Sequence, residues 1–287
     1  MTAPTTAPRP GPGPTAERNG VTVAVDGTDT GLRAVRWAAD EASARGGSLA
    51  LVHAAPYAAG SAGSLRAHAS RILARAYTVA RRHAPQVPAH TVLLDQDPLG
   101  ALVEISRQTS RLGGLLVVGR TGTGHASDAL VGSLAVHVVS RAQGPVVVVG
   151  PLAGAPGGPV VAAVGDPVTD LGVLTQAHRA AARHGVRLEV VHAARNASEG
   201  AEARDGLERV LRTLDLAEPG VTVSVEVARE RPYEAVVEYS RSAGLLVIGA
   251  GRGHRHLLGS TTRTAIRFAG CPVLVAVPEP ETPDEER

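Results

Sequence analysis

Two stretches of the sequence lie 139 residues apart and align without a gap: Val25–His53 (VDGTDTGLRAVRWAADEASARGGSLALVH) and Val164–His192 (VGDPVTDLGVLTQAHRAAARHGVRLEVVH). Each begins at the end of one apolar run, passes through a helical segment and ends in a second apolar run. A spacing of this length exceeds that of solenoid repeats and fits two whole domains in tandem. The sequence therefore predicts a duplicated domain.

Each half reads as five short apolar strands that alternate with helices. In the first half we expect strands at Val21–Asp26, Leu49–His53, His90–Leu94, Leu115–Gly119 and Val146–Val149, and in the second at Val160–Val164, Arg187–His192, Val221–Val227, Leu245–Gly249 and Val273–Val277. Continuous Val-rich runs are typical of parallel strands that are buried on both faces. The pattern predicts two tandem three-layer α/β/α domains, each with a five-stranded parallel sheet.

Composition agrees with this class and excludes several others. Only 2% of the 287 residues are aromatic, so the cores have to be built from Val, Leu, Ala and Ile. The single Cys cannot form an internal disulfide, and no signal peptide or membrane-length apolar run is present, so we expect a cytoplasmic protein without a membrane partner. The basic residues are spread among acidic ones and form no stripe, which argues against a nucleic-acid partner.

Shifts in composition mark the expected domain boundaries. Residues 1–20 are rich in Pro, Thr, Gly and Ala and predict a disordered tail. Residues 21–150 form the first domain, 151–158 a linker of Pro, Gly and Ala, and 159–278 the second domain. Residues 279–287 form an acidic tail that is broken by proline.

The strongest chemical signal is the Gly-rich segment that follows the fourth strand of the first half, GRTGTGHASDALVGS, from Gly119 to Ser133. Glycines let backbone N–H groups approach an anion closely, and the start of the next helix favours a phosphate. The segment alone is weak support for a phosphate site. The chain has no GxxxxGK[ST] sequence, and no GxGxxG follows the first strand, which excludes a P-loop NTPase and makes NAD an unlikely ligand.

The spacing Gly119-x2-Gly122-x9-Gly132-Ser133, together with VAVDGT at 23–28 and LVHA at 51–54, resembles the nucleotide-binding signature of universal stress proteins. The resemblance covers residues 21–278, twice, and indicates a tandem universal stress protein of the actinobacterial type. It implies a sheet in the order 3-2-1-4-5, bound ATP with or without Mg²⁺, a role in stress response, and dimerisation through the last strand.

Carried over to this sequence, the resemblance implies a set of nucleotide-binding residues in the first domain. Asp26 would contact the adenosine end of the ligand, and the Ala54 backbone would line the adenine pocket. The residues that would lie at or next to the ribose and phosphates are Gly119, Thr121, Gly122, Gly132, Ser133 and Leu134. The alternative for Asp26 is a purely local role in an Asx-turn, because Asp-Gly is a common turn pair.

The second half departs from this pattern at two places. Gly165 stands where the first half has Asp26, although Asp166 is adjacent, and the loop between Gly249 and Gly259 is three residues shorter than its counterpart. A shorter loop cannot follow the same path around a triphosphate, so we expect one nucleotide site in the first domain and a degenerate site in the second. A smaller anion at the basic residues of the short loop is the alternative.

No catalytic constellation is evident, so the sequence does not predict an enzyme, although slow hydrolysis of bound ATP stays open. His53 and His192 end equivalent strands without metal-ligand spacing around them, which favours a structural role. The two functional hypotheses are an ATP-binding cytoplasmic regulator of the stress response and a scaffold that binds no nucleotide and acts through protein contacts. The protein partner is unknown in both.

The last strands of the two halves bear on assembly. Val146–Val149 and Val273–Val277 are apolar sheet edges, which tend to pair unless they are protected. We expect them to meet within one chain, so that the two domains form a pseudo-dimer. Further pairing of whole chains into a homodimer is an alternative that the sequence leaves open.

Overall fold

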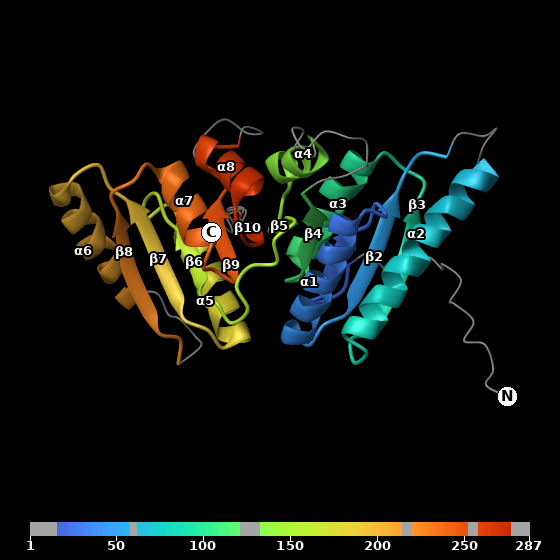
Figure 1. Ribbon diagram of the computed structural model, residues 1–287, viewed down its shortest axis with the longest axis horizontal. Coiled ribbons are helices and arrows are strands. Elements are labelled where there is room, and N and C mark those ends of the chain that lie inside the picture. Colours follow the sequence, from blue (N-terminus) through green and yellow to red (C-terminus); the bar gives the residue numbers. More distant parts are fainter. Residues whose placement is uncertain (1–15, 58–61, 121–132, 214–219, 252–257, 277–287) are drawn as a thin grey trace, which may run out of the picture. The chain divides into compact units, whose positions relative to one another are not determined.

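The computed structural model describes residues 16–57, 62–120, 133–213, 220–251 and 258–276. The chain divides into two compact units, Met1–Ala153 and Gly154–Arg287, and each is considered by itself (Figure 1). The expected domain boundaries, with a linker at 151–158, stay a prediction.

Unit 1 contains a regular alternation of strands and helices. Its elements are β1 (Val21–Ala24), α1 (Asp29–Arg45), β2 (Leu49–Ala54), α2 (Ala62–His83), β3 (Ala89–Leu94), α3 (Pro98–Arg111), β4 (Leu115–Gly119), α4 (Ser133–Arg141) and β5 (Val146–Val149). Two of the expected strands, β4 and β5, have the predicted ends. The others differ by one or two residues, because a strand end depends on the last ladder hydrogen bond rather than on hydrophobicity.

Unit 2 repeats this order. Its elements are β6 (Val160–Ala163), α5 (Leu171–His184), β7 (Leu188–Ala193), α6 (Ala197–Thr213), β8 (Val223–Ala228), α7 (Pro232–Ser240), β9 (Leu245–Gly249), α8 (Ser260–Phe268) and β10 (Val273–Ala276). One difference affects the candidate site. Helix α5 begins at Leu171, which aligns with Leu32, whereas α1 begins at Asp29.

All strand pairs within each unit are parallel, and the two units share one topology. The order is β3-β2-β1-β4-β5 in unit 1 and β8-β7-β6-β9-β10 in unit 2. The expected fold class and the order 3-2-1-4-5 are therefore confirmed. In this topology the carboxyl ends of the first and fourth strands are neighbours where the strand order reverses, which is where ligands bind in open parallel sheets.

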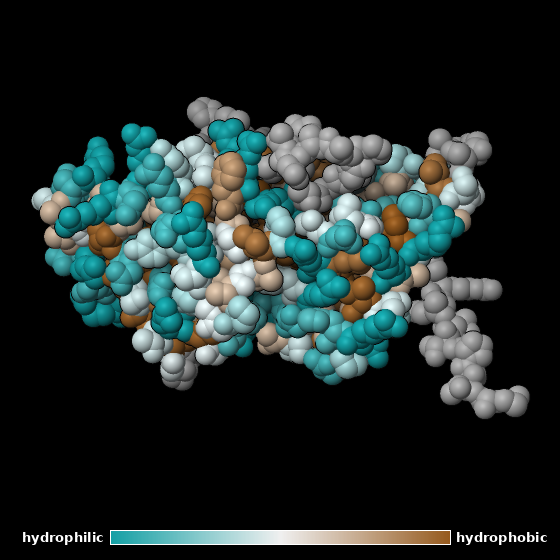
Figure 2. Space-filling model, viewed as in Figure 1, coloured by the Kyte–Doolittle hydropathy of each residue, from teal (hydrophilic) through white to brown (hydrophobic). Residues whose placement is uncertain are grey.

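Helices pack against the sheets and enclose cores of small aliphatic side chains. In unit 1, α1 packs against α2 and α3 against α4; in unit 2, α5 packs on β6 and β9, and α7 packs against α8 (Figure 1). The strands β5 and β10 are buried along their whole lengths. On the face shown in Figure 2, hydrophobic side chains are scattered among hydrophilic ones. None of the described helices is both long and apolar enough to cross a bilayer.

Equivalent glycines end the first helix of each unit. Gly46 follows α1 with φ 62° and Gly185 follows α5 with φ 63°, and both adopt the left-handed conformation that a side chain would disfavour. Thr28 caps the other end of α1, since its hydroxyl accepts a hydrogen bond from Gly31 N. Because Pro167 aligns with Thr28, the first turn of α5 lacks this hydroxyl cap.

Cys271 is a buried small side chain, with 2% of its surface exposed. Burial raises the pKa of its thiol to about 12. We therefore expect slow labelling by a thiol reagent at pH 8 in the native protein and rapid labelling in denaturant. The unfolded thiol ionises near its ordinary pKa of 9.0, so ionisation of Cys271 should lower the free energy of unfolding as the pH rises from about 9 towards 12. Equal labelling rates in the two states would contradict this assignment.

Candidate nucleotide-binding cavities

The carboxyl ends of β1, β2 and β4 border a cavity of about 300 Å³ in unit 1. Residues of α3 and α4 also line it. Its lining residues are Ala24, Val25, Asp26, Val52, His53, Ala54, Ala55, Pro98, Leu102, Val118, Gly119, Leu134 and Ala135. The lining is mainly apolar, and Asp26 is the acidic group on it.

Four of the residues that we expected from the sequence to bind nucleotide lie together in the structure. Asp26, Ala54, Gly119 and Leu134 line this one cavity. Ser133 is the first residue of α4 and adjoins Leu134. The other nominated residues, Thr121, Gly122 and Gly132, lie outside the described residues. Pro98 and Leu102 were not predicted from the sequence, because these apolar residues of α3 belong to no recognisable binding motif.

The Asp26 carboxylate is held by the turn that begins α1. Its Oδ1 accepts hydrogen bonds from Thr28 N at 2.9 Å and from Thr28 Oγ1 at 2.7 Å. Asp26 therefore forms an Asx-turn and also lines the cavity. Within the described part of the chain, no hydrogen bond reaches Oδ2.

Gly31 leaves the space that the Asp26 carboxylate occupies. A Cβ atom added at Gly31 would lie 2.4 Å from Asp26 Oδ1, far inside van der Waals contact. A Cβ atom added at Gly119 would lie 3.6 Å from the Gly31 backbone, so the end of β4 also approaches the start of α1 closely. The first turn of α1 therefore needs glycine at this position for the carboxylate to keep its place.

Equivalent histidines are fixed by the first strand of each unit. The Nδ1 atom of His53 lies 2.7 Å from Val25 O, and that of His192 lies 3.0 Å from Val164 O. Since only a protonated Nδ1 can donate to a carbonyl, these contacts set the tautomer of each ring. Each ring is therefore held by the backbone, and His53 also lines the cavity of unit 1.

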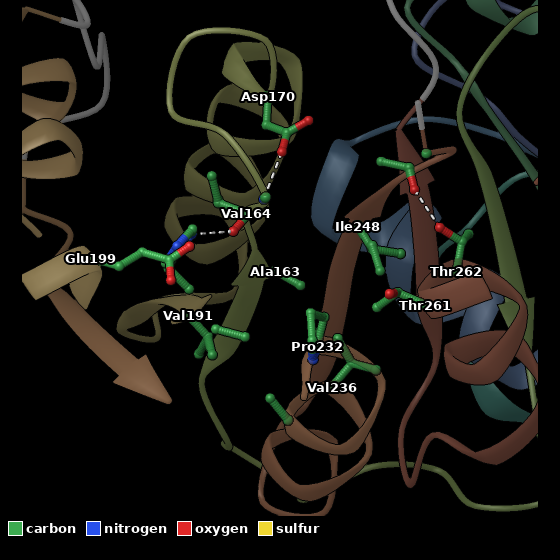
Figure 3. Close-up of a pocket in the computed structure, with 16 residues that line it drawn as sticks. Ala163, Val164, Asp170, Val191, Glu199, Pro232, Val236, Ile248, Thr261 and Thr262 are labelled. Atoms are coloured by element: carbon green, nitrogen blue, oxygen red, sulfur yellow. Dashed lines mark hydrogen bonds between the residues drawn. The ribbon is translucent and has the colours of Figure 1, made fainter. Parts of the chain in front are cut away.

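Unit 2 contains a cavity of about 390 Å³ at the corresponding strand ends (Figure 3). Its lining residues are Ala163, Val164, Gly165, Asp170, Val191, His192, Ala193, Glu199, Pro232, Ala235, Val236, Ile248, Gly249, Gly251, Thr261 and Thr262. Asp170 and Glu199 lie on the side formed by α5 and α6, and Thr261 and Thr262 on the side formed by α8. Unit 2 therefore has a cavity at its strand ends, although its sequence departs from the pattern of the first half.

Of the two neighbouring aspartates, Asp170 lines the second cavity and Asp166 does not. Asp166 Oδ1 accepts hydrogen bonds from Val168 N and Thr169 N, both at 3.0 Å, and so stabilises the turn before α5. Asp170 Oδ2 accepts from Gly165 N at 2.7 Å and from Asp166 N at 3.0 Å. The sequence analysis missed Asp170, although the gapless alignment places it opposite Gly31.

Hydroxyl groups replace apolar groups where the last helix meets the second cavity. Thr261 and Thr262 align with Leu134 and Ala135. Thr262 Oγ1 donates a hydrogen bond to Gly249 O at 2.8 Å, which ties α8 to the end of β9. The second cavity is therefore the more polar on this side.

Glu199 also borders the second cavity and is charged at neutral pH. Hydrogen bonds from the side chain and the backbone of Arg195 lower the pKa of the Glu199 carboxyl. The Arg195 Nε atom lies 3.2 Å from Glu199 Oε2. The charge of Glu199 is thus partly balanced, and Asp170 is the carboxylate without a cationic partner among the described residues.

Comparisons with known proteins agree with the duplication. The model of the universal stress protein family matches residues 18–150 and 158–277. A universal stress protein of Mycobacterium tuberculosis H37Rv is 30% identical over 90% of this chain and 94% of its own, and a second one from the same strain is 29% identical over 91% and 97%. The crystal structure of a universal stress protein from Archaeoglobus fulgidus superposes with a TM-score of 0.70 at 18% identity, over 94% of this chain and 98% of that chain.

Proposed function

Because this chain belongs to the universal stress protein family, we propose that it is an ATP-binding regulator of the stress response in the cytoplasm, with its ATP site in unit 1. The observation that carries the proposal is the cavity on which Asp26, Ala54, Gly119 and Leu134 converge. It lies at the carboxyl ends of β1 and β4, the position that open parallel sheets use for ligands.

The cavity offers suitable chemistry to both parts of a nucleoside. Val25, Val52, Pro98 and Leu102 provide an apolar surface for a flat heterocyclic base. The Asp26 carboxylate, with Oδ2 free of hydrogen bonds from the described residues, accepts hydrogen bonds from ribose hydroxyls. Asp26 is also pre-ordered by Thr28, so little side-chain entropy is lost on binding.

The phosphates would lie where β4 leads towards α4. Helix α4 begins at Ser133, and the N-terminus of a helix attracts anions through its unpaired N–H groups and its dipole. The glycines of the sequence between Gly119 and Ser133 would let further backbone N–H groups approach. Mg²⁺, when bound with ATP, would neutralise part of the phosphate charge.

We propose regulation rather than catalysis, because the sequence contains no recognisable catalytic motif; slow hydrolysis of bound ATP stays an alternative. Binding ATP to the native state would stabilise unit 1 and change the surface that it presents to a protein partner. The scaffold hypothesis makes the opposite prediction for nucleotide: the full chain would not bind ATP.

The Asp26→Ala variant tests this site. We expect its ATP affinity to fall about tenfold to a hundredfold, since a hydrogen bond to a charged group contributes about 1.5–3 kcal/mol. Asp29→Ala is the matched control: it removes the same charge nearby, but the Asp29 side chain is 88% exposed and does not line the cavity. Calorimetric titration of both variants measures the difference. Equal affinities would assign Asp26 to the turn alone, and an absence of ATP binding by the unmodified chain would favour the scaffold.

A further inference from the structure

Helix α2 is an exception to the mixed charges that the sequence predicts for this chain. Its 22 residues contain five arginines and no aspartate or glutamate. The arginine side chains are all exposed, at Arg66, Arg71, Arg75, Arg81 and Arg82. Arg66 and Arg75 form ion pairs with neighbouring elements, whereas no carboxylate of the described residues pairs with Arg71 or Arg82. Helix α2 therefore carries positive charge that the described part of unit 1 does not neutralise.

The arginines of α2 share their outer face with small side chains. The opposite face, with the buried Ile72, Leu73 and Ala76, packs against α1, β2 and β3 (Figure 1). The exposed residues that follow one another along the outer face at helical spacing are Ala67, Arg71, Ala74, Arg75, Thr78 and Arg82. Because alanine and threonine separate the arginines, another helix can approach this face closely.

Helix α6, the equivalent helix of unit 2, carries the opposite charge on the first half of its outer face. It packs against β7 and β8 as α2 packs against β2 and β3 (Figure 1). The exposed residues of this half include Ser198, Ala201, Glu202 and Asp205. No described residue forms an ion pair with Glu202 or Asp205, whereas Glu208, in the second half, lies 4.0 Å from Arg212. The first half of α6 thus presents two carboxylates beside small side chains.

The charge of the whole sequence divides in the same sense. Residues 1–153 contain 14 arginines and 9 acidic residues, and residues 154–287 contain 15 arginines and 18 acidic residues, with no lysine in either part. Unit 1 is therefore positive and unit 2 negative. Between two copies of the chain, unlike units attract and like units repel, which favours contact of α2 with unit 2 over contact of α2 with α2.

We propose that the outer face of α2 docks on the first half of α6 of a second copy of this chain. Arg71 and Arg75 lie about one turn apart on α2. Glu202 and Asp205 are separated by nearly the same distance along α6, so two arginine–carboxylate pairs can form where the helices cross. Arg75 is available for this contact, because its ion pair with Asp29 is exposed and 3.4 Å long, and such pairs contribute little.

The proposed contact joins two different surfaces, so it is heterologous. A pair of chains joined by one such contact keeps one α2 and one α6 free, and further copies can add to it. A crossing of two helices buries little area, so the association is weak and depends on charge. It does not depend on ATP binding in unit 1.

Sedimentation velocity of the full-length chain tests the proposal. In about 0.1 M salt, where the Debye length is about 10 Å, we expect the average mass to rise with protein concentration. In about 1 M salt, where it is about 3 Å, the rise should disappear. Arg71→Glu with Arg75→Glu should abolish the rise, and so should Glu202→Arg with Asp205→Arg. Circular dichroism of both variants verifies that they are folded.

Arg111→Glu combined with Arg141→Glu is the matched control. Both arginines are exposed, belong to unit 1 and lie outside α2, so the control changes the net charge of unit 1 equally. It should associate like the native chain. Loss of association in this control would assign the effect to net charge and would overturn the proposed surface.

Mixing the two reversed variants tests whether the two helices recognise each other. Each variant alone has like charges at the two contact sites and should not associate. In the mixture each reversed site meets a site of opposite charge, so we expect association to return. The proposal is overturned if the native chain keeps one mass at all concentrations, if a reversed variant alone associates like the native chain, or if the mixture does not associate. Binding of DNA or anionic vesicles by α2 in place of self-association would likewise overturn it.

Discussion

Replacing Gly31 by valine is expected to weaken ATP binding in unit 1 on the order of a hundredfold or more. The new Cβ atom would lie 2.4 Å from Asp26 Oδ1, and the carboxylate has to rotate away from Thr28 and from the cavity. The variant therefore loses the charged hydrogen bond, which is worth about 1.5–3 kcal/mol, and places a branched side chain beside Gly119 at the same time. Titration calorimetry with ATP and Mg²⁺ measures the loss.

Gly172→Val is the matched control for this substitution. Gly172 also lies in the first turn of a helix, α5, and a Cβ atom added there meets nothing within 4 Å. Because glycine has a lower helix propensity than valine, this substitution should change stability by less than about 1 kcal/mol and leave ATP affinity unchanged. If Gly31→Val binds ATP like the parent chain, the carboxylate of Asp26 does not contribute to the site.

Truncation of Leu246 to alanine is expected to destabilise unit 2 by about 2–5 kcal/mol. Leu246 lies in β9 and has no exposed surface, so its removal leaves a cavity in a core of small aliphatic side chains that cannot collapse around it. Urea unfolding followed by circular dichroism should show the lower midpoint.

Val168→Ala is the control for the truncation, since Val168 is in the same unit and is 68% exposed. Its effect should stay within about 0.5 kcal/mol. A Leu246→Ala midpoint as high as that of the control would contradict the placement of β9 between β6 and β10 in the sheet of unit 2.

The fold was predictable because several local signals agree with one another. Val-rich runs that are apolar on both faces specify central parallel strands, and Gly46 and Gly185 end the first helices at aligned positions with positive φ. Pro98 likewise begins α3, a position that favours proline, with Asp97 accepting a hydrogen bond from Gly100 N. Consistency of this kind between pattern and caps is what lets a short strand be located within one or two residues.

The candidate site was only partly predictable, because it depends on where a turn directs its side chains. Asp26 could be identified from the strand that precedes it. In unit 2 the sequence has Gly165 opposite Asp26, with Asp166 beside it, and predicted a degenerate site. The structure shows that α5 begins later and that the turn directs Asp170 to the cavity. The sequence signal for Asp170 was the exchange of aspartate and glycine between two aligned positions. It can be interpreted only once the structure shows that a side chain at Gly31 would occupy the space of the Asp26 carboxylate.

The most direct test of the central claim is the stoichiometry of ATP binding to the unmodified full-length chain, measured by isothermal titration with Mg²⁺. The account predicts one ATP per chain, with the binding heat greatly reduced in Asp26→Ala and unchanged in Asp170→Ala. Two ATP molecules per chain, or a single one whose binding depends on Asp170 and not on Asp26, would contradict it.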